Sequence, residues 1–185
     1  NSKIFEKKIF KNIWVQPASG DAGGSIGAAL CCYHIYKNNK RIVKKNDSMQ
    51  GSFLGPKYTN SQINYLLKKN KVKFKHLSNK EIINQTVKYI IKGKTIGWFQ
   101  DRMEFGPRAL GNRSIIADPR SKTMQKMLNL KIKFRESFRP FAPSVLESEY
   151  KKWFDIPMKK SPYMLFTANL KKERKLKLSI KNKNL

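Results

Sequence analysis

The sequence has few of the residues that build disulfide frameworks or zinc sites. Two of its 185 residues are cysteine and two are histidine, and the cysteines are the neighbours Cys31 and Cys32. Vicinal cysteines seldom bond to each other, and two cysteines cannot supply a disulfide framework or a four-ligand zinc site. We therefore expect a protein of the reducing cytoplasm.

Long apolar runs are also missing. No apolar run approaches the roughly 18–20 residues that cross a bilayer, and no signal-peptide pattern opens the chain. The hydrophobic content of 39% and the mean hydropathy of −0.61 fit a soluble protein. The sequence therefore predicts no membrane partner.

Acidic side chains are scarce, and the formal net charge is +28, from 40 basic and 12 acidic residues. Such an excess normally suggests a polyanionic partner, either nucleic acid or an acidic membrane surface. The lysines are spread over almost every segment, however, and Asn and Ile are abundant too, which is typical of a global compositional bias. A generically basic surface and a nucleic-acid face both stay open at this point.

Arginine is rare but concentrated. Six of the eight arginines lie between Arg102 and Arg139. A guanidinium can grip phosphate or carboxylate with two parallel hydrogen bonds, and lysine cannot reproduce that geometry. Because the rest of the chain uses lysine for positive charge, this stretch is the predicted place of the chemistry.

Helical and extended patterns alternate along the chain. Ser78 and Glu81 have the spacing of a capping box, which opens a helix. Apolar spacing predicts helices that end near residue 36 and that cover 60–69, 79–92, 121–130 and 147–153. Short apolar or alternating runs predict extended segments at 13–15, 71–77, 95–99, 142–146 and 163–168. The predicted fold class is α/β or α+β.

The first candidate site is the glycine-rich turn at 20–25. Gly20 and Gly23 let the backbone approach a phosphate, and the N-terminus of the following helix offers free amides. Asp21 can hold a divalent metal there. The alternative is that Asp21 and Ser25 only cap the helix, with the glycines serving a tight turn.

The second candidate site combines the arginine-rich blocks 100–120 and 131–144. Their prolines stiffen the loops, and their phenylalanines can wall a pocket or stack on a base. Several guanidiniums in one rigid concavity repel each other, and Glu104, Asp118 and Glu136 compensate only part of that charge. A polyphosphate ligand is the economical explanation. The alternative is a set of surface salt bridges.

Several blocks of the chain resemble the O-carbamoyltransferase family, which includes enzymes of nodulation-factor, cephamycin and tobramycin biosynthesis. Residues 97–115, GWFQDRMEFGPRALGNRSI, are similar to the family's signature and are followed by ADPR at 117–120. KFRE, FRPFAPSV and SPYM, at 133–136, 138–145 and 161–164, are similar to later blocks. Such long blocks are far more specific than a short pattern. The family usually has glycine where this chain has Asp101.

The resemblance covers roughly residues 12–170 and implies a two-domain enzyme. An N-terminal domain of the actin-like ATPase superfold carries out carbamoyl transfer with a divalent metal such as iron. A C-terminal YrdC-like domain, a twisted sheet with helices, makes carbamoyl adenylate from carbamoyl phosphate and ATP with Mg²⁺. We expect the chain to be part of a longer protein, divided into the end of the first domain, a linker, the YrdC-like domain and a basic tail, at 1–37, 38–50, 51–170 and 171–185.

The resemblance and the arginine pattern together assign roles to individual residues. The catalytic candidates are Arg102, Glu104, Arg108, Arg113, Lys133 and Arg135. The candidates for binding substrate or nucleotide are Ser114, Arg139, Ser144, Gly20 and Gly23, and the candidate metal ligand is Asp21. Fixed cations and positioning suffice for attack on the α-phosphorus of ATP, without a covalent nucleophile. The partners implied are carbamoyl phosphate, ATP and a small hydroxyl-bearing acceptor.

A nucleic-acid-binding module is the alternative function, since YrdC-like surfaces are also associated with RNA. A surface that tracks a nucleic-acid backbone tolerates lysine and spreads its charge. This chain concentrates arginine among Gly-Pro turns instead. The arrangement favours the enzyme.

Replacing Arg108 with lysine tests bidentate recognition against bulk charge. Arg108→Lys keeps the charge but removes the planar fork, so it should cost on the order of 1.5–3 kcal/mol in carbamoyl-adenylate formation. The measurement is ATP–pyrophosphate exchange driven by carbamoyl phosphate at fixed ionic strength. Changing Lys171 and Lys172 to Gln should barely alter that rate. If the change of Lys171 and Lys172 to Gln costs as much activity as Arg108→Lys does, net charge rather than bidentate recognition governs binding.

Overall fold

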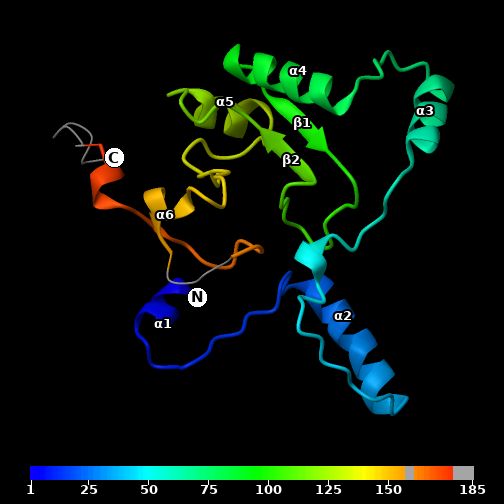
Figure 1. The fold of residues 1–185 in the computed structure, drawn as a ribbon, viewed down its shortest axis with the longest axis vertical. Coiled ribbons are helices and arrows are strands. Elements are labelled where there is room, and N and C mark those ends of the chain that lie inside the picture. The colour runs from blue at the N-terminus through cyan, green and yellow to red at the C-terminus, as the bar shows by residue number, and fades with distance from the viewer. Residues whose placement is uncertain (157–160, 177–185) are drawn as a thin grey trace. The chain divides into compact units, whose positions relative to one another are not determined.

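The computed structural model describes residues 1–156 and 161–176 of the chain (Figure 1). These residues form two compact units, one built from residues 1–16 together with those from 144 onward, and the other from 17–143. Among the described residues, no helix is both long and apolar enough to cross a membrane.

The 17–143 unit holds most of the regular structure. Its elements in chain order are α2 (Asp21–Cys31), η1 (Cys32–Tyr36), η2 (Gln50–Ser52), α3 (Asn60–Lys69), α4 (Asn79–Ile91), β1 (Ile96–Phe99), β2 (Arg113–Ile116) and α5 (Met124–Lys131). Both α3 and α4 begin at capping boxes, in which Thr59 pairs with Gln62 and Ser78 pairs with Glu81. Each box satisfies amides that the first helical turn leaves without partners, which explains why the helices begin there.

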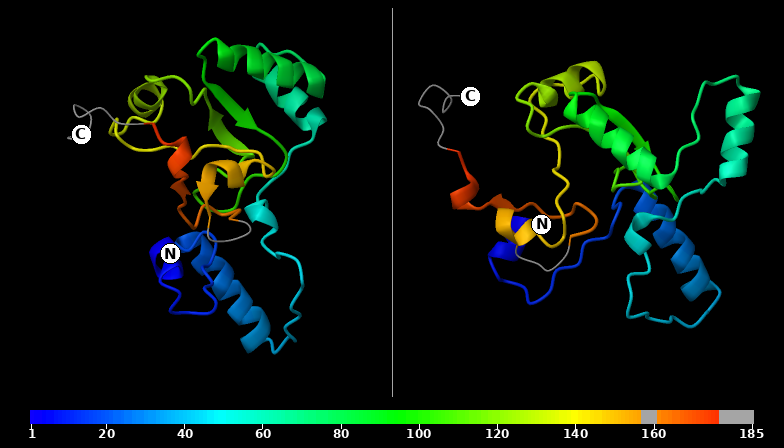
Figure 2. Two further views of the ribbon diagram at one scale, coloured as in Figure 1. Left: turned by 60° about the vertical axis from the view of Figure 1, so that its left-hand side comes forward. Right: turned by 45° about the horizontal axis from the view of Figure 1, so that its top comes forward.

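Strands β1 and β2 form an antiparallel hairpin, with Ile96 opposite Ile116 and Phe99 opposite Arg113. One further backbone bond, from the Gln100 amide to the Asn112 carbonyl at 2.9 Å, continues the pairing beyond the strands. Helix α4 lies against β1, as the turned views show (Figure 2). The hairpin therefore presents the arginine-rich segment 101–111 as its connecting loop.

The other unit brings together segments far apart in sequence, and its elements are α1 (Ser2–Glu6), α6 (Tyr150–Trp153), β3 (Phe154–Asp155), β4 (Asn169–Leu170) and η3 (Lys172–Arg174). The Ser2 hydroxyl accepts the Thr167 amide at 2.7 Å and donates to the Thr167 carbonyl at 3.0 Å. The rings of Phe5 and Phe166 meet edge to face, 6.1 Å apart. These contacts hold the first helix against residues near the other end of the chain.

Most predicted helices and one predicted strand are confirmed. The helices at 60–69 and 79–92 are found within one residue, the 121–130 helix begins at Met124, and the 95–99 strand is β1. The prediction of strands at 13–15 and 71–77 is wrong, because these segments pair with no other strand in the described part of the chain. An alternating pattern needs a neighbouring strand to bond its backbone, and none lies beside them. The predicted extended segments 142–146 and 163–168 likewise form no strand.

Helices together with two small antiparallel sheets are consistent with the predicted class. The predicted bounds 1–37, 38–50 and 51–170 stay a prediction. The predicted basic tail is described as far as residue 176, and 177–185 lies outside the described residues.

Gly106 is the point where the glycine-rich turn meets the arginine-rich loop. Its φ of 97° is a conformation that favours glycine, and a Cβ added there would lie 2.6 Å from the Cβ of Ala18 and 4.0 Å from that of Ala22. Ala18 precedes the turn, and Ala22 lies in the first turn of α2. The two candidate sites of the sequence are therefore neighbours within one unit.

Replacing Gly106 with alanine should destabilise the chain by about 1–3 kcal/mol, because the new Cβ is strained by φ and overlaps Ala18. The measurement is the free energy of unfolding in denaturant. Gly27→Ala is the matched control, since Gly27 lies inside α2 with open space around it. That change should stabilise the helix by about 0.5–1 kcal/mol. Equal stability of Gly106→Ala and the parent chain would contradict the packing described here.

Candidate functional site

The base of the arginine-rich loop is closed by the buried amide of Asn112. Its Nδ2 donates to the Arg102 carbonyl at 2.9 Å, and its Oδ1 accepts from Gln100 Nε2 at 3.2 Å. Asn112 is 8% exposed, so these hydrogen bonds are shielded from water. The amide thereby ties both ends of the loop to each other.

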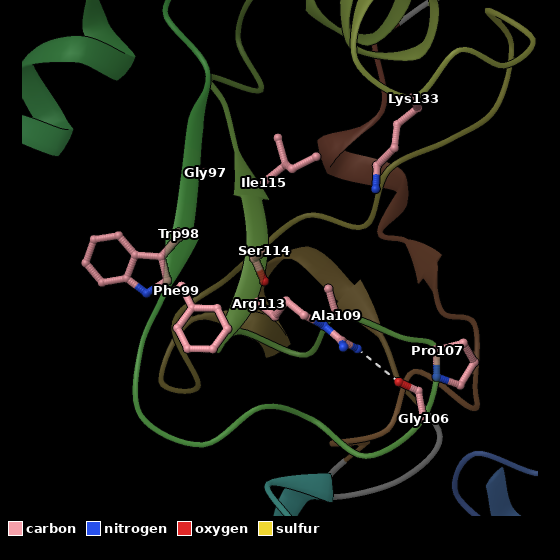
Figure 3. A pocket seen from close by; sticks show the side chains of 10 residues that line it. All are labelled: Gly97, Trp98, Phe99, Gly106, Pro107, Ala109, Arg113, Ser114, Ile115 and Lys133. Carbon is pink, nitrogen blue, oxygen red and sulfur yellow. Dashed lines mark hydrogen bonds between the residues drawn. The ribbon is translucent and has the colours of Figure 1, made fainter. Parts of the chain in front are cut away.

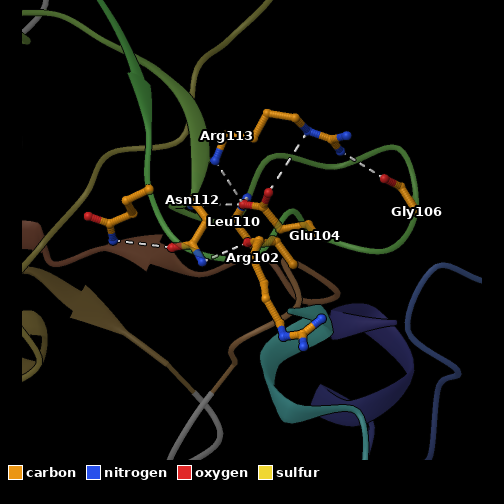
Figure 4. Close-up of polar contacts among 7 residues, drawn as sticks. Arg102, Glu104, Gly106, Leu110, Asn112 and Arg113 are labelled. Carbon is orange, nitrogen blue, oxygen red and sulfur yellow. Dashed lines mark hydrogen bonds and ion pairs between the residues drawn. The ribbon is translucent and has the colours of Figure 1, made fainter. Parts of the chain in front are cut away.

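Inside the loop, the carboxylate of Glu104 organises the backbone (Figure 4). Its Oε1 accepts the amides of Leu110, Asn112 and Arg113 at 2.7, 2.9 and 3.3 Å. The residue is 3% exposed. A buried carboxylate that receives several amide donors is strongly stabilised as the anion, so these bonds fix the path of residues 110–113.

Burial opposes ionisation of Glu104, but the amide donors outweigh it and hold the pKa of the carboxyl below its ordinary value of 4.5. The second oxygen, Oε2, is buried and accepts no hydrogen bond from the described residues. Its nearest cation is Arg113 Nε at 3.9 Å. Arg113 also donates from Nη2 to the Gly106 carbonyl at 2.9 Å, so the loop holds this guanidinium at two points.

The outer edge of the loop is held by residues 52–56. Met103 donates its amide to the Pro56 carbonyl at 3.0 Å, and its own carbonyl accepts the Gly55 amide at 2.9 Å. The guanidinium of Arg102 donates to the Gly55 carbonyl at 2.9 Å. Arg102 is therefore engaged in holding the segment beside the loop.

Asp101 stands where the resemblance leads one to expect glycine, and its backbone has a conformation typical of glycine. Its φ is 49°, in the left-handed region that glycine adopts most readily and that aspartate tolerates better than most residues. Its carboxylate pairs with Lys57 Nζ at 2.5 Å, and both side chains are more than half exposed. The backbone conformation at Asp101 is therefore one that glycine, the residue expected from the family pattern, also adopts.

An open pocket of about 600 Å³ lies over the hairpin (Figure 3). Its lining combines both strands, the arginine-rich loop and the segment after α5, and consists of Gly97, Trp98, Phe99, Gly106, Pro107, Ala109, Arg113, Ser114, Ile115 and Lys133. Arg113 and Lys133 bring positive charge from separate segments, and none of the described lining residues is acidic. The pocket is therefore suited to an anion with an apolar or aromatic part.

The second arginine-rich block is folded around Asn129 of α5, which is fully buried. Asn129 Nδ2 donates to the carbonyls of Ser137 and Arg139 at 3.1 and 2.8 Å. Its Oδ1 accepts from Arg135 Nε at 2.7 Å, and the Arg135 guanidinium lies 4.9 Å from the centre of the Phe141 ring. One amide thus sets the course of the segment that follows α5.

Carboxylates neutralise two of the other arginines. Arg120 binds both oxygens of Asp118, with Nε at 2.9 and 3.1 Å and Nη2 at 2.7 Å. Hydrogen bonds from Arg120 lower the pKa of Asp118 to about 2. Arg139 Nε lies 2.8 Å from Glu136 Oε2, and both side chains are about half exposed. The salt-bridge alternative therefore describes these two arginines.

The structure brings Arg113, Ser114 and Lys133 into one pocket. The Glu104 carboxylate lies next to one of them, with its Oε2 3.9 Å from Arg113 Nε. Arg108 is exposed between two lining residues, and its guanidinium has no hydrogen-bond or ion-pair partner within 1–156 and 161–176. These assignments stay predictions.

The remaining predicted residues lie outside the pocket lining. Gly20 is the residue before α2, and Asp21 and Gly23 lie in its first turn, where Gly23 is buried. The described residues include no group of three or more His, Cys, Asp and Glu side chains suited to a metal ion. Asp21 alone therefore does not make a metal site from this chain's own residues. Ser144 is the first residue of the second segment of the other compact unit.

Asn112 and Asn129 were not among the residues predicted from the sequence. A signal for Asn129 was present, because asparagine is a poor helix former and its place inside an amphipathic helix suggests a specific hydrogen-bonding role. For Asn112 the signal was its position between a glycine and an arginine inside the signature block. In both cases the partners are carbonyl groups and side chains several residues away, which sequence spacing does not identify.

Comparisons with known proteins agree with the resemblance. The family model described as the carbamoyltransferase C-terminus matches residues 87–181, and the model described as the carbamoyltransferase N-terminus matches residues 1–30. The C-terminal model thus covers the hairpin, the pocket and both arginine-rich blocks.

Several curated proteins are similar over nearly the whole chain. An uncharacterized protein of Synechocystis sp. is 49% identical over 187 residues, which cover 100% of this chain and 30% of that protein. Nodulation protein NolNO of Sinorhizobium fredii is 34% identical (95% of this chain, 26% of that protein), and nodulation protein NolO of Bradyrhizobium diazoefficiens is 35% identical (94% and 32%). The chain spans about a third or less of the length of these relatives.

Replacing Glu104 with glutamine should remove a pH-dependent part of the stability. Because the folded-state pKa of Glu104 is lowered, its carboxylate stabilises the fold above the unfolded-state pKa, and this contribution is lost as the pH falls through the folded-state pKa. We expect Glu104→Gln to lower the free energy of unfolding by about 1–3 kcal/mol at neutral pH.

The difference should shrink as the pH falls below about 4.5, because the wild-type carboxyl then takes up a proton. Denaturant unfolding at several pH values measures it. Glu149→Gln is the control, since Glu149 pairs with Lys152 at the surface and the change should cost at most about 1 kcal/mol. A pH-independent difference for Glu104→Gln would refute the assignment of a buried, ionised carboxylate.

Proposed function

The chain belongs to the carbamoyltransferase family, and from this premise we propose that its 17–143 unit binds ATP and carbamoyl phosphate and forms carbamoyl adenylate. The carbamoyl group would then pass to a hydroxyl of a small molecule in a biosynthetic pathway. The observation that carries the proposal is the pocket over the hairpin, whose described lining residues include Arg113 and Lys133 and no acidic side chain.

The charge of the pocket supports an anionic ligand. Two cations that share one open pocket repel each other, and a bound phosphate compensates both. Glu104 does not neutralise the site fully, because Oε1 is taken by three amides and Oε2 is 3.9 Å from Arg113 Nε. The pocket therefore keeps a net positive charge for a ligand.

The proposed formation of carbamoyl adenylate takes two steps. Water cleaves carbamoyl phosphate to carbamate and inorganic phosphate. A carbamate oxygen then attacks the α-phosphorus of ATP, a new P–O bond forms, and the bond to the pyrophosphate leaving group breaks. Negative charge grows on the non-bridging oxygens and the leaving group, and fixed donors that face this charge lower the barrier.

In this proposal, Arg113 and Lys133 stabilise the developing charge, and the Ser114 hydroxyl orients an oxygen. Arg108, which lies in sequence between the lining residues Pro107 and Ala109 and has no side-chain partner among the described residues, grips a phosphate when ligand is bound. Glu104 acts through Arg113, because its carboxylate fixes the loop that carries this side chain. Arg102 has two proposed roles. Its hydrogen bond to the Gly55 carbonyl helps to hold the loop, and its guanidinium also contacts the ligand directly.

The wider architecture is also part of the proposal. The YrdC-like fold for the adenylate-forming domain and an actin-like fold for the transfer domain rest on the resemblance. Mg²⁺ would arrive with ATP. Asp21 would supply one ligand to a metal such as iron in the transfer domain, but this chain's described residues do not complete such a site.

Carbamoyl-phosphate-dependent exchange of labelled pyrophosphate into ATP tests the function. Wild-type chain should show exchange when carbamoyl phosphate is present, and Lys133→Gln should lose roughly tenfold or more, the scale of one charge-assisted hydrogen bond. The matched control is Lys126→Gln, which removes the same charge from an exposed position on α5. Its exchange rate should stay within about twofold of wild type.

The same variants separate the enzyme from the nucleic-acid alternative. If Lys126→Gln weakens ATP binding as much as Lys133→Gln does, and all polyanions bind alike with a steep salt dependence, the basic surface rather than the pocket is responsible. Calorimetric titration with ATP and Mg²⁺ at two salt concentrations gives this comparison. Absence of carbamoyl-phosphate-dependent exchange in the wild-type chain would contradict adenylate formation.

A further inference from the structure

We propose that Asn129 is a positioning residue, which aims the Arg135 guanidinium at an oxyanion; the proposal rests on the function above. Asn129 is fully buried, and its amide uses both N–H donors and an oxygen acceptor on one segment. The donors fix the carbonyls of Ser137 and Arg139, and the acceptor takes Arg135 Nε. A buried amide satisfied in this way holds its partners in one geometry.

Arg135 is held on three sides. Its backbone amide donates to the Asn129 carbonyl at 3.0 Å, its Nε donates to Asn129 Oδ1 at 2.7 Å, and its guanidinium lies 4.9 Å from the centre of the Phe141 ring. The two Nη groups have no hydrogen-bond or ion-pair partner within the described ranges. These two groups form a fork that matches a phosphate or carboxylate, and the side chain has little freedom left to lose on binding.

The neutral character of Asn129 is what separates Arg135 from its neighbours. Arg120 and Arg139 are each paired with a carboxylate, Asp118 and Glu136 respectively. A carboxylate that fixes a guanidinium also cancels much of its attraction for an anion, whereas an amide fixes it and leaves the charge. Arg135 is thus oriented by a neutral group and has no ion pair within the described residues, although its charge also helps to lower the pKa of Glu136. Lys133, two residues earlier, lines the pocket.

A double-mutant cycle on the 185-residue chain tests the inference, with inorganic pyrophosphate as the calorimetric probe. Asn129→Ala should weaken pyrophosphate binding roughly tenfold in the wild-type background but less than about twofold in an Arg135→Lys background. That non-additivity follows only if Asn129 acts through the guanidinium. Losses that add in full would overturn the proposal, because Asn129 would then act independently of Arg135.

Gln125→Ala is the matched control for loosening of the same segment. Gln125 donates to the Phe138 and Arg139 carbonyls at 3.2 and 3.1 Å, and the hydrogen bonds of the described residues do not join it to Arg135. It should lose less than about twofold in binding, since the Arg135 fork stays in place. A loss equal to that of Asn129→Ala would show that segment stability, rather than aim, governs binding, and would overturn the proposal.

The NMR signal of the Arg135 Nε–H group gives a readout independent of activity. It should exchange slowly with water in wild type and in Gln125→Ala, and rapidly in Asn129→Ala. If Asn129→Ala does not fold, the wild-type chain decides: the Nη signals of Arg135 should shift on pyrophosphate binding while its Nε–H signal stays slow to exchange. Nη signals that do not shift when pyrophosphate binds would overturn the proposal.

The two proposals fail separately. A wild-type chain without carbamoyl-phosphate-dependent exchange contradicts adenylate formation. Pyrophosphate binding and the Nε–H signal still decide whether Asn129 aims Arg135.

Discussion

The buried carboxylate of Glu104 is the constraint on which the candidate site depends. It gathers three backbone amides on one oxygen and thereby fixes the last residues of the arginine-rich loop and the first residue of β2. A buried anion is costly unless it is well satisfied, so the loop is stable only in a shape that brings these amides together. The placement of Arg113, and with it the positive side of the pocket, follows from that shape.

Two asparagines also fix loop backbone through side-chain hydrogen bonds, at places where a carboxylate would cancel positive charge. Asn112 closes the base of the first arginine-rich block, and Asn129 fixes the second. Amides can donate and accept at once, and they do not neutralise a nearby guanidinium. The arginines of this region thus differ in their partners: Arg120 and Arg139 pair closely with carboxylates, Arg113 Nε lies 3.9 Å from Glu104, and Arg135 Nε donates to a neutral amide. This difference, more than the total charge of +28, explains why one part of a basic surface is suited to a specific anion.

Close contact at Gly106 connects two motifs that are more than 80 residues apart. The absence of a side chain lets the loop approach Ala18, while the Gly106 carbonyl accepts from Arg113. A change in the glycine-rich turn would therefore be felt at the arginine-rich loop through direct packing. If the turn contributes to carbamoyl transfer, as proposed from the resemblance, its neighbour in space is the loop proposed to form the adenylate.

The sequence by itself determined the local structure wherever short-range chemistry decides it. Apolar spacing predicted α3, and apolar spacing with a capping box at 78–81 predicted α4, each within one residue. The signature block identified the family and the stretch that carries the pocket. The local pattern wrongly predicted strands at 13–15 and 71–77. A strand forms only where a second strand hydrogen-bonds to it, and the sequence of one segment does not show whether such a partner lies beside it. Only the tertiary structure decided which arginines are neutralised, which amides hold the loops, and that Gly106 lies against Ala18. Those outcomes depend on distances between residues far apart in the chain, and they are set by packing and by the need to satisfy every buried polar group.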